Sequence, residues 1–227
     1  QVFEGSELKG GFTQITTRMD PKFERLTEAL GEHYTIGDIY FKPYTACRHT
    51  HGAAQATLEL MKEERPDPAD IAAVEVFTYG MAVIAVGKGV AERDTFVNAQ
   101  FSIPYVTAVC ILDGALGPLQ LTEKRMADPA LFALSKKVSV QMDEALNGAY
   151  PDKTSSRVEM LLRSGRRLVR QVDVPKGDPR DPMEAADLAD KVRFFAGSRE
   201  KEQTERIIGM ILNLETIPDI RDLIGLV

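Results

Sequence analysis

The chain has 227 residues, of which 44% are hydrophobic and 27% charged, an ordinary composition for a globular protein that can bury a sizeable core. Its formal net charge of −6 speaks against nucleic acid or an anionic membrane surface as a partner. The longest apolar stretch, Met81–Val86, is far shorter than the roughly 18 residues that span a bilayer. We therefore expect neither a nucleic-acid-binding protein nor a membrane protein.

The cysteine content and the first residue bear on where the protein works. Two cysteines, Cys47 and Cys110, are too few for a disulfide framework, so a reducing compartment and a cytoplasmic location are expected. The chain opens with Gln1 instead of methionine and shows no signal-peptide pattern. This start predicts a processed polypeptide, or one whose front part is missing.

The first half of the chain predicts two helices and two strands after a glycine-rich connection. Residues 1–20 show no core-forming period, and an Asp-Pro pair then predicts the N-terminus of a short helix over residues 21–30. Alternating apolar residues predict one strand over residues 36–44 and another over residues 71–79. Between them, apolar residues spaced by four and three predict a helix over residues 49–64.

The second half predicts a buried helix followed by three strands. Residues 101–112 are apolar nearly all round, with a proline in the first turn and Asp-Gly after the last. Residues 137–143 alternate between apolar and polar side chains, as a half-buried strand does. The same alternation over residues 157–163 and 168–174, around the turn Ser164-Gly165, predicts an antiparallel hairpin.

A proline-rich linker and amphipathic helices mark the end of this domain. The elements above indicate an α+β domain from about residue 35 to 175. The composition changes at Pro175–Pro182, and Asp181–Glu184 then supplies an N-cap, a proline at the first helical position and an acid at the third. An apolar stripe around Ile207 in the terminal helices has no obvious local partner. We expect these helices to pack on something outside this chain or on a missing front part.

A basic cluster occurs beside the predicted hairpin turn. Its members are Arg163, Arg166, Arg167 and Arg170. Such a cluster can bind anions, but we favour the solvated edge of a strand pair.

The segment Phe41–His51 concentrates the polar chemistry of the chain. It lies at a strand-to-helix junction, and a helix N-terminus favours a bound carboxylate. Arg48 would clamp such a carboxylate with two hydrogen bonds. Lys42, His51 and Tyr105 are candidates for acid–base catalysis. The alternative is that the histidines only cap the helix and that Lys42 is solvated.

Cofactor motifs are weak or missing. Cys47, His49 and His51 occupy alternate positions, which on a strand would point one way, but a fourth ligand at zinc-site spacing is lacking. Gly87-Lys88-Gly89 lacks the spacing of a phosphate-binding P-loop, and no dinucleotide-binding or serine-hydrolase motif occurs. We therefore expect no metal and no organic cofactor.

The segment FKPYTACRHTHGAAQATLEL resembles the MmgE/PrpD family, which includes 2-methylcitrate dehydratase, cis-aconitate decarboxylase and iminodisuccinate epimerase. The family pattern is a strand end like Lys-Pro-Tyr-Pro, then Cys-Arg-x-Thr-His, then an alanine-rich helix. Here Thr45 stands where the second proline is usual. Further matches follow in order over nearly the whole chain: Asn98–Tyr105, Leu112–Gly114, Asp128-Pro129, Lys137–Val140, Tyr150-Pro151 and Gly177–Pro182.

The resemblance implies a larger homodimeric protein with an all-helical domain and a smaller α+β lid inserted before its last helices. Residues 1–34 would then be the end of a helical-domain segment and a connection. Residues 35–176 would form the MmgE/PrpD-type α+β lid domain. Residues 177–227 would be a linker and C-terminal helices that return to the helical domain. The N-terminal helical half would be missing from this chain.

The resemblance also implies an active site between the two domains. Lys42, at the strand end, and Tyr105, in the Phe-Ser-x-x-Tyr segment, would be catalytic. His51, Arg48 and Cys47 fall on pattern positions, and we expect His51 to act as a catalytic orienting group and the other two to bind substrate. The helical half would add further aspartate, histidine and lysine side chains.

Enzymes of this kind remove a proton next to a carboxylate, then expel a hydroxyl, lose carbon dioxide or return the proton to the other face. The expected function is the C-terminal part of a cofactor-independent hydro-lyase of the 2-methylcitrate dehydratase type, acting on a small di- or tricarboxylate. Lys42 and Arg48 would stabilise the enolate, and Tyr105 would donate a proton. Alternatives are an epimerase, isomerase or decarboxylase of the same family, and a non-catalytic binding or assembly subunit. The chain alone is expected to be inactive.

Overall fold

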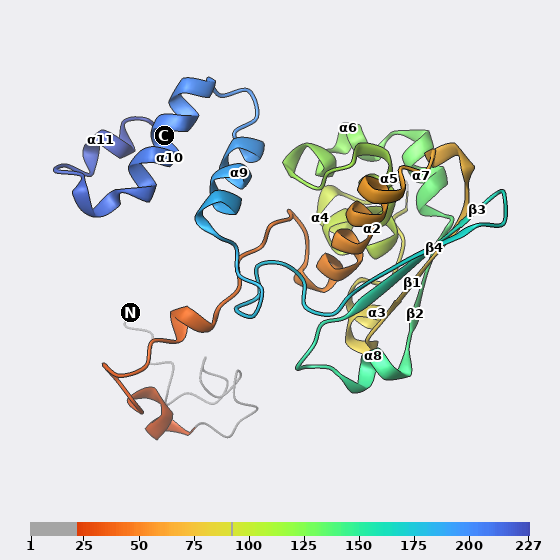
Figure 1. Cartoon of the computed structure of the whole chain (residues 1–227), viewed down its shortest axis with the longest axis horizontal. Helices are drawn as coiled ribbons and strands as arrows, with labels where there is room; N and C mark the ends of the chain where they lie inside the picture. The colour runs from red at the N-terminus through yellow and green to blue at the C-terminus, as the bar shows by residue number, and fades with distance from the viewer. Residues whose placement is uncertain (1–21, 92) are drawn as a thin grey trace. The chain divides into compact units, whose positions relative to one another are not determined.

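The computed structural model describes residues 22–91 and 93–227 (Figure 1). The chain divides into two units, residues 1–39 and residues 40–227. In the first unit the described residues form two 3₁₀ turns, η1 (Phe23–Leu26) and η2 (Thr35–Asp38). The predicted connection over residues 1–20 lies outside the described residues.

The prediction of a helix over residues 21–30 is wrong, because only the 3₁₀ turn η1 forms there among the described residues. Ala29 and Gly31 have positive φ angles of 53° and 87°. Two left-handed residues so close together end a regular helix. The Asp-Pro pair that predicted its start lies outside the described residues.

The predicted strand over residues 36–44 is also wrong. Its first half forms η2, and the rest has no strand partner among the described residues. Ile39 and Phe41 are 48% and 51% exposed, so their alternation does not mark a buried face. Pro43 has no N–H for a strand ladder, and the Phe41 N–H donates to Gly177 instead.

A four-stranded mixed sheet is the framework of the second unit, with the strand order β2-β1-β3-β4. β1 and β2 are parallel, and β3 is antiparallel to β1. β3 is also antiparallel to β4, which confirms the predicted hairpin. The strands are β1 (Ile71–Thr78), β2 (Val138–Met142), β3 (Ser156–Leu162) and β4 (Arg167–Val172). The register places Val74 opposite Met160 and Val76 opposite Val158, all four buried.

Helices complete the second unit, and the predicted α+β class is confirmed. The α-helices are α2 (His51–Glu64), α3 (Gly80–Val86), α4 (Phe96–Gln100), α5 (Ile103–Asp113), α6 (Glu123–Met126), α7 (Pro129–Ser135), α8 (Glu144–Gly148), α9 (Ala185–Phe195), α10 (Lys201–Leu212) and α11 (Arg221–Ile224). Shorter 3₁₀ turns are η3 (Arg48–Thr50), η4 (Pro68–Asp70), η5 (Pro118–Leu121) and η6 (Leu214–Thr216).

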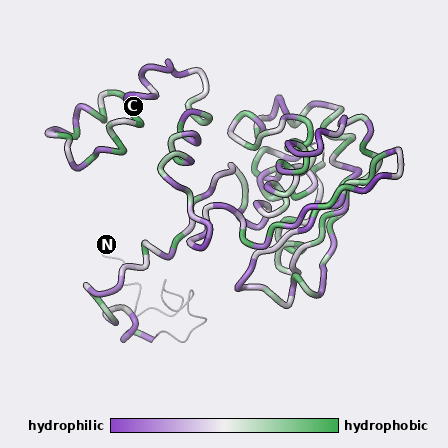
Figure 2. Tube along the Cα trace, viewed as in Figure 1, coloured by the Kyte–Doolittle hydropathy of each residue, from purple (hydrophilic) through white to green (hydrophobic). Residues whose placement is uncertain are grey.

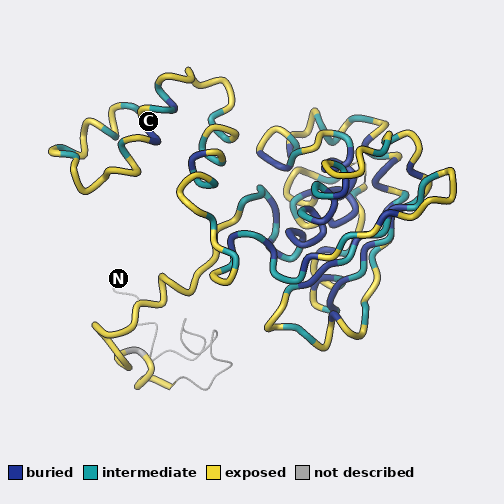
Figure 3. Tube along the Cα trace, viewed as in Figure 1, coloured by how far each residue is buried: buried dark blue, intermediate teal, exposed yellow. Residues whose placement is uncertain are grey.

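The core lies between the sheet and the helices α2 and α5, and apolar residues gather along these elements (Figures 2 and 3). α2 packs on β3 and β4 through small residues, and Gly52 comes so close that a Cβ there would lie 2.8 Å from Ser156 Oγ. α5 is buried on every side except its last two residues, as its composition predicted. Ser102 caps its N-terminus and Gly114 ends it at a φ of 62°.

The four arginines near the hairpin turn are engaged at the sheet edge. Arg166 pairs with Glu64, Arg167 with Glu75 and Glu159, and Arg170 with Glu59 and Glu63. Arg163 donates to the carbonyl oxygen of Ala69 over 3.0 Å. The interpretation as a strand-pair edge is confirmed, because acidic neighbours pair with three of these arginines and a backbone carbonyl accepts from the fourth.

The terminal helices begin later than predicted. The N-cap of α9 is Glu184, whose N–H donates to the Asp187 side chain over 2.9 Å. Asp181 caps nothing, because its backbone closes a turn with Asp178 and Gly177. The apolar stripe is only partly covered: Ile207 is 8% exposed, and much of α10 and α11 is exposed (Figure 3). What packs on it stays a prediction.

A membrane-spanning segment would require a long apolar helix. Within residues 22–91 and 93–227, none of the helices has the length and apolar character to cross a bilayer.

Candidate active site

Residues 40–51 follow an irregular path into η3 and then α2. Two segments distant in sequence hold these residues: the Phe41 N–H donates to the carbonyl of Gly177, and the Cys47 N–H donates to the carbonyl of Gln100 at the end of α4, each over 2.9 Å. Gly177 has a φ of +88°, and a Cβ there would lie 2.0 Å from the Phe41 carbonyl oxygen. Only glycine fits such a contact, so the predicted linker is fastened to the candidate site.

The guanidinium of Arg48 fastens the same two segments. Its side chain is buried, with Nη2 donating to the Pro175 carbonyl over 2.8 Å and Nη1 to the Lys176 carbonyl over 2.9 Å. The guanidinium carbon also lies 4.6 Å from the centre of the Tyr40 ring. Two N–H groups that would clamp a substrate are therefore already used.

The charge of Arg48 is not matched by an ion pair. Within the described part of the chain, no carboxylate lies within 4.0 Å of it. Asp178 is the acid that raises its pKa most, and it is itself paired with Arg180 at 2.8 Å. Burial lowers the pKa of Arg48, and Asp178 opposes that effect. The group remains a buried cation that projects a positive field.

The imidazole of His51 lies against the Arg48 guanidinium and has no exposed surface. Its Nδ1 lies 3.4 Å from Arg48 Nη1, and its Nε2 lies 3.3 Å from the Ala46 carbonyl oxygen. A guanidinium only donates and a carbonyl only accepts, so the imidazole proton is on Nε2. Burial and then the Arg48 charge lower the pKa of His51 to about 3. This geometry suits a positioning group better than a proton carrier.

Three cations lie within electrostatic reach of His51, because the charges of Arg48, Lys42 and Lys191 all lower its pKa. Arg48 is the one at contact distance, and Lys191 lines a pocket together with Pro43, the neighbour of Lys42 in sequence. We call these three residues the cationic cluster. Lys42 is exposed, and Lys191 comes from α9, far along the chain. Among the residues described, none of these three cations has an ion-pair partner, whereas nearby Lys176 is paired with two aspartates at 3.3 Å each. Burial also lowers the pKa of Lys191.

A second polar group lies next to the cluster. Half-buried His49 places its Nδ1 2.6 Å from the hydroxyl oxygen of Tyr79, at the end of β1. The Tyr79 ring stacks on Tyr150 with centres 4.6 Å apart. Through this contact with His49 the Tyr79 hydroxyl lies against the segment Phe41–His51.

Tyr105 lies in different surroundings. It is buried in α5, and its hydroxyl donates to the Gln120 carbonyl over 2.6 Å. Burial raises its pKa to about 12, with Arg125 and Asp113 as its charged neighbours. Its hydrogen bonds do not reach residues 40–51, and its role as a proton donor stays a prediction.

A model of the MmgE/PrpD C-terminal domain matches residues 44–216, most of the chain. The chain belongs to the MmgE/PrpD family. A curated protein that it resembles is the cis-aconitate decarboxylase-like protein oryM of Aspergillus oryzae, which is 24% identical over 247 aligned positions. The alignment covers all of this chain and 49% of that protein. The chain thus spans about half the length of the curated relative it matches.

Membership of the MmgE/PrpD family confirms the resemblance drawn from residues 41–60. The motif did not indicate Lys191 or Tyr79. Both are distant from it in sequence, and the fold brings them near it. Lys191 is one of several polar residues on an amphipathic helix, and Tyr79 ends an ordinary strand pattern. No local signal marked either of them.

The possible metal ligands of this MmgE/PrpD chain do not converge. His51 is turned toward Arg48 and Ala46, while His49 faces Tyr79. Over residues 22–91 and 93–227, no three His, Cys, Asp or Glu side chains gather as a metal site requires.

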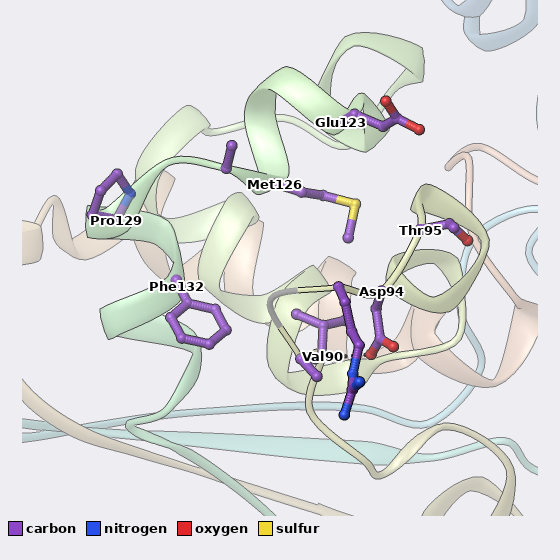
Figure 4. A pocket seen from close by; sticks show the side chains of 10 residues that line it. Val90, Asp94, Thr95, Glu123, Met126, Pro129 and Phe132 are labelled. Atoms are coloured by element: carbon purple, nitrogen blue, oxygen red, sulfur yellow. Dashed lines mark hydrogen bonds between the residues drawn. The ribbon is translucent and has the colours of Figure 1, made fainter.

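A separate cavity of about 520 Å³ lies away from these residues (Figure 4). Val90 and Asp94 line it from the loop before α4, and Met126 and Phe132 line it from α6 and α7. None of the predicted site residues belongs to this lining.

Proposed function

We propose that this chain is the carboxyl-terminal part of a lyase that acts on a small di- or tricarboxylate, with dehydration of the 2-methylcitrate type as the leading reaction. The observation that carries the proposal is the cationic cluster of Lys42, Arg48 and Lys191. Among the described residues these three cations have no ion-pair partner, and in a chain of net charge −6 we propose that they create a local site of positive potential. A carboxylate-rich substrate is the natural ligand of such a site.

Removing a proton next to a carboxylate creates a dianionic enolate, and cations placed beforehand stabilise that charge. Exposed Lys42 would contact the substrate, and Lys191 would hold a second carboxylate. Arg48 would contribute its field while it fixes the turn at Pro175, and His51 would position it. We propose that Tyr105 donates the proton and Cys47 lines the site. A helical half, which the relatives' greater length suggests, would complete the catalytic groups and support a homodimer.

Decarboxylation is a second candidate, because the printed name of the Aspergillus oryzae relative is that of a cis-aconitate decarboxylase-like protein. Loss of carbon dioxide needs the same stabilised carbanion, with the carboxylate instead of a hydroxyl as the leaving group. Epimerisation shares the first step as well.

A substrate panel on the protein assembled with its helical half tests the proposal. The panel contains 2-methylcitrate, citrate, cis-aconitate and iminodisuccinate. Dehydration raises the ultraviolet absorbance of a new C=C bond, decarboxylation releases carbon dioxide, and epimerisation changes optical rotation alone. We expect dehydration of a hydroxylated tricarboxylate. Turnover of none of these compounds, with no binding in calorimetry, would overturn the enzyme assignment and favour an assembly subunit.

A further inference from the structure

His49 and Tyr79 form the shortest side-chain contact of the candidate site. Tyr79 is 1% exposed, and the 2.6 Å contact joins its hydroxyl oxygen to Nδ1 of His49. The two rings meet at 63° with centres 5.6 Å apart. Stacking on Tyr150 at an interplanar angle of 9° fixes the phenol from its other side. Both partners are therefore held in place before any substrate arrives.

The position of the shared proton follows from what each group can do. Burial raises the pKa of Tyr79, so the phenol keeps its proton. Among the described residues, His49 Nδ1 is the one hydrogen-bond partner of that hydroxyl. A buried O–H without an acceptor is costly, so the phenol donates to Nδ1. The imidazole of His49 then carries its own proton on Nε2.

Nε2 of His49 is free to meet a ligand. It makes no hydrogen bond with the described residues. The atom is not fully buried, so it reaches solvent. Burial lowers the pKa of His49, which keeps the ring neutral near pH 7. His51 differs, because both of its nitrogens are occupied. Of the two histidines in the segment, only His49 offers an N–H.

We propose that His49 is a further catalytic residue, whose Nε2–H, fixed by Tyr79, donates a hydrogen bond to the substrate carboxylate that gains charge when the adjacent proton leaves. This role rests on the proposed function. Tyr79 is the positioning residue, and its partner His49 follows Arg48 of the cationic cluster directly in η3. A neutral donor supplements the cations without repelling them.

The first test is the tautomer of His49, measured by nitrogen-15 NMR on the 227-residue chain. The chain has three histidines, so the signals are assigned with His33→Gln and His49→Gln variants. We expect His49 as the Nε2–H tautomer in the wild type and a mixture of both tautomers in Tyr79→Phe. An Nδ1–H tautomer in the wild type would overturn the inference.

The second test is turnover by the assembled protein. His49→Ala should lower kcat by about 100- to 1,000-fold with little change in KM, because an oxyanion donor acts mainly in the transition state. His49→Gln, which restores an N–H donor, should recover part of the loss, and exposed His33→Gln should match the wild type. Normal kcat in His49→Ala, with Lys42→Ala inactive, would overturn only the role of His49. Absence of wild-type turnover would overturn the proposed function as well.

Discussion

Arg48 donates a buried 2.8 Å hydrogen bond to the carbonyl oxygen of Pro175, 127 residues further along the chain. The bond joins the start of α2 to the turn that leaves β4. With Gly177 against Phe41, it makes one compact unit of two segments that are distant in sequence. The candidate site therefore depends on the end of the domain as much as on its own motif.

Replacing Arg48 should weaken folding strongly. Arg48→Met would leave the carbonyls of Pro175 and Lys176 buried without donors, and we expect a loss of about 2–4 kcal/mol of unfolding free energy. The measurement is urea unfolding of the chain. Arg166→Met is the matched control, because its pair with Glu64 is exposed and such pairs contribute roughly 1 kcal/mol or less. Equal losses in both variants would show that the buried hydrogen bonds of Arg48 stabilise the fold no more than an exposed ion pair does.

The stability of the chain should fall as the pH drops below about 6.5. The folded pKa of His51 is about 3, whereas an unfolded histidine has a pKa of about 6.5. The unfolded chain therefore binds more protons between these values, and each pH unit in that window costs up to about 1.4 kcal/mol. His49 acts in the same direction. Unfolding measured from pH 7 to 5, above the range of the carboxylates, should give a shallower slope for His51→Gln than for the wild type.

If His51→Gln kept the full slope, the titration of some other group would have to explain it, and the neutral state assigned to His51 would be wrong.

The two lysines of the cluster should affect kinetics differently. Lys42→Ala should lower kcat of the assembled protein by at least about 100-fold, because its ammonium stabilises charge in the transition state. Lys191→Ala should mainly raise KM, by about 10-fold, because it holds a carboxylate that does not react. Lys201→Ala, an exposed change at the start of α10, is the control for charge removal. Unchanged kinetics in both cluster variants would contradict the anion site.

Two glycines should respond to alanine with opposite signs. Gly52→Ala pushes a methyl against Ser156, whose hydroxyl is held by Thr78, so we expect a net loss of about 1–2 kcal/mol despite a better helix former. Gly209→Ala, in α10, meets no atom within 4 Å and should gain about 0.5–1 kcal/mol. Thermal unfolding of both variants measures the difference. A gain at Gly52 would mean that α2 does not pack closely on β3.

The elements that the sequence predicted well are those whose burial follows their own periodicity. α2 and the four strands show their buried faces in the spacing of apolar residues, whereas α5 shows its burial in being apolar nearly all round. The prediction of a strand over residues 36–44 was wrong although apolar and polar residues do alternate there. The backbone of Phe41 bonds to a turn at Gly177 and not to another strand. The predicted helix N-cap at Asp181 was wrong for a similar reason, because the backbone of Asp181 closes that same turn.

The residues of the candidate site also differ in how well the sequence predicted them. Residues 41–51 form a contiguous motif, so Lys42, Arg48 and the histidines could be named in advance. Lys191 and Tyr79 join them only through the packing of α9 and β1, which no local pattern encodes. Tyr105 was predicted beside them, yet its hydroxyl faces Gln120.

The strand β4 ends the sheet, and a free sheet edge invites pairing with the strands of other molecules. Arg167 and Arg170 on this strand are already committed to glutamates of β1, β3 and α2. Charged side chains on an edge strand disfavour such pairing, because an incoming strand would have to accommodate and partly desolvate them. We therefore expect the arginines that could have formed an anion site to oppose edge-to-edge pairing of β4 with other molecules.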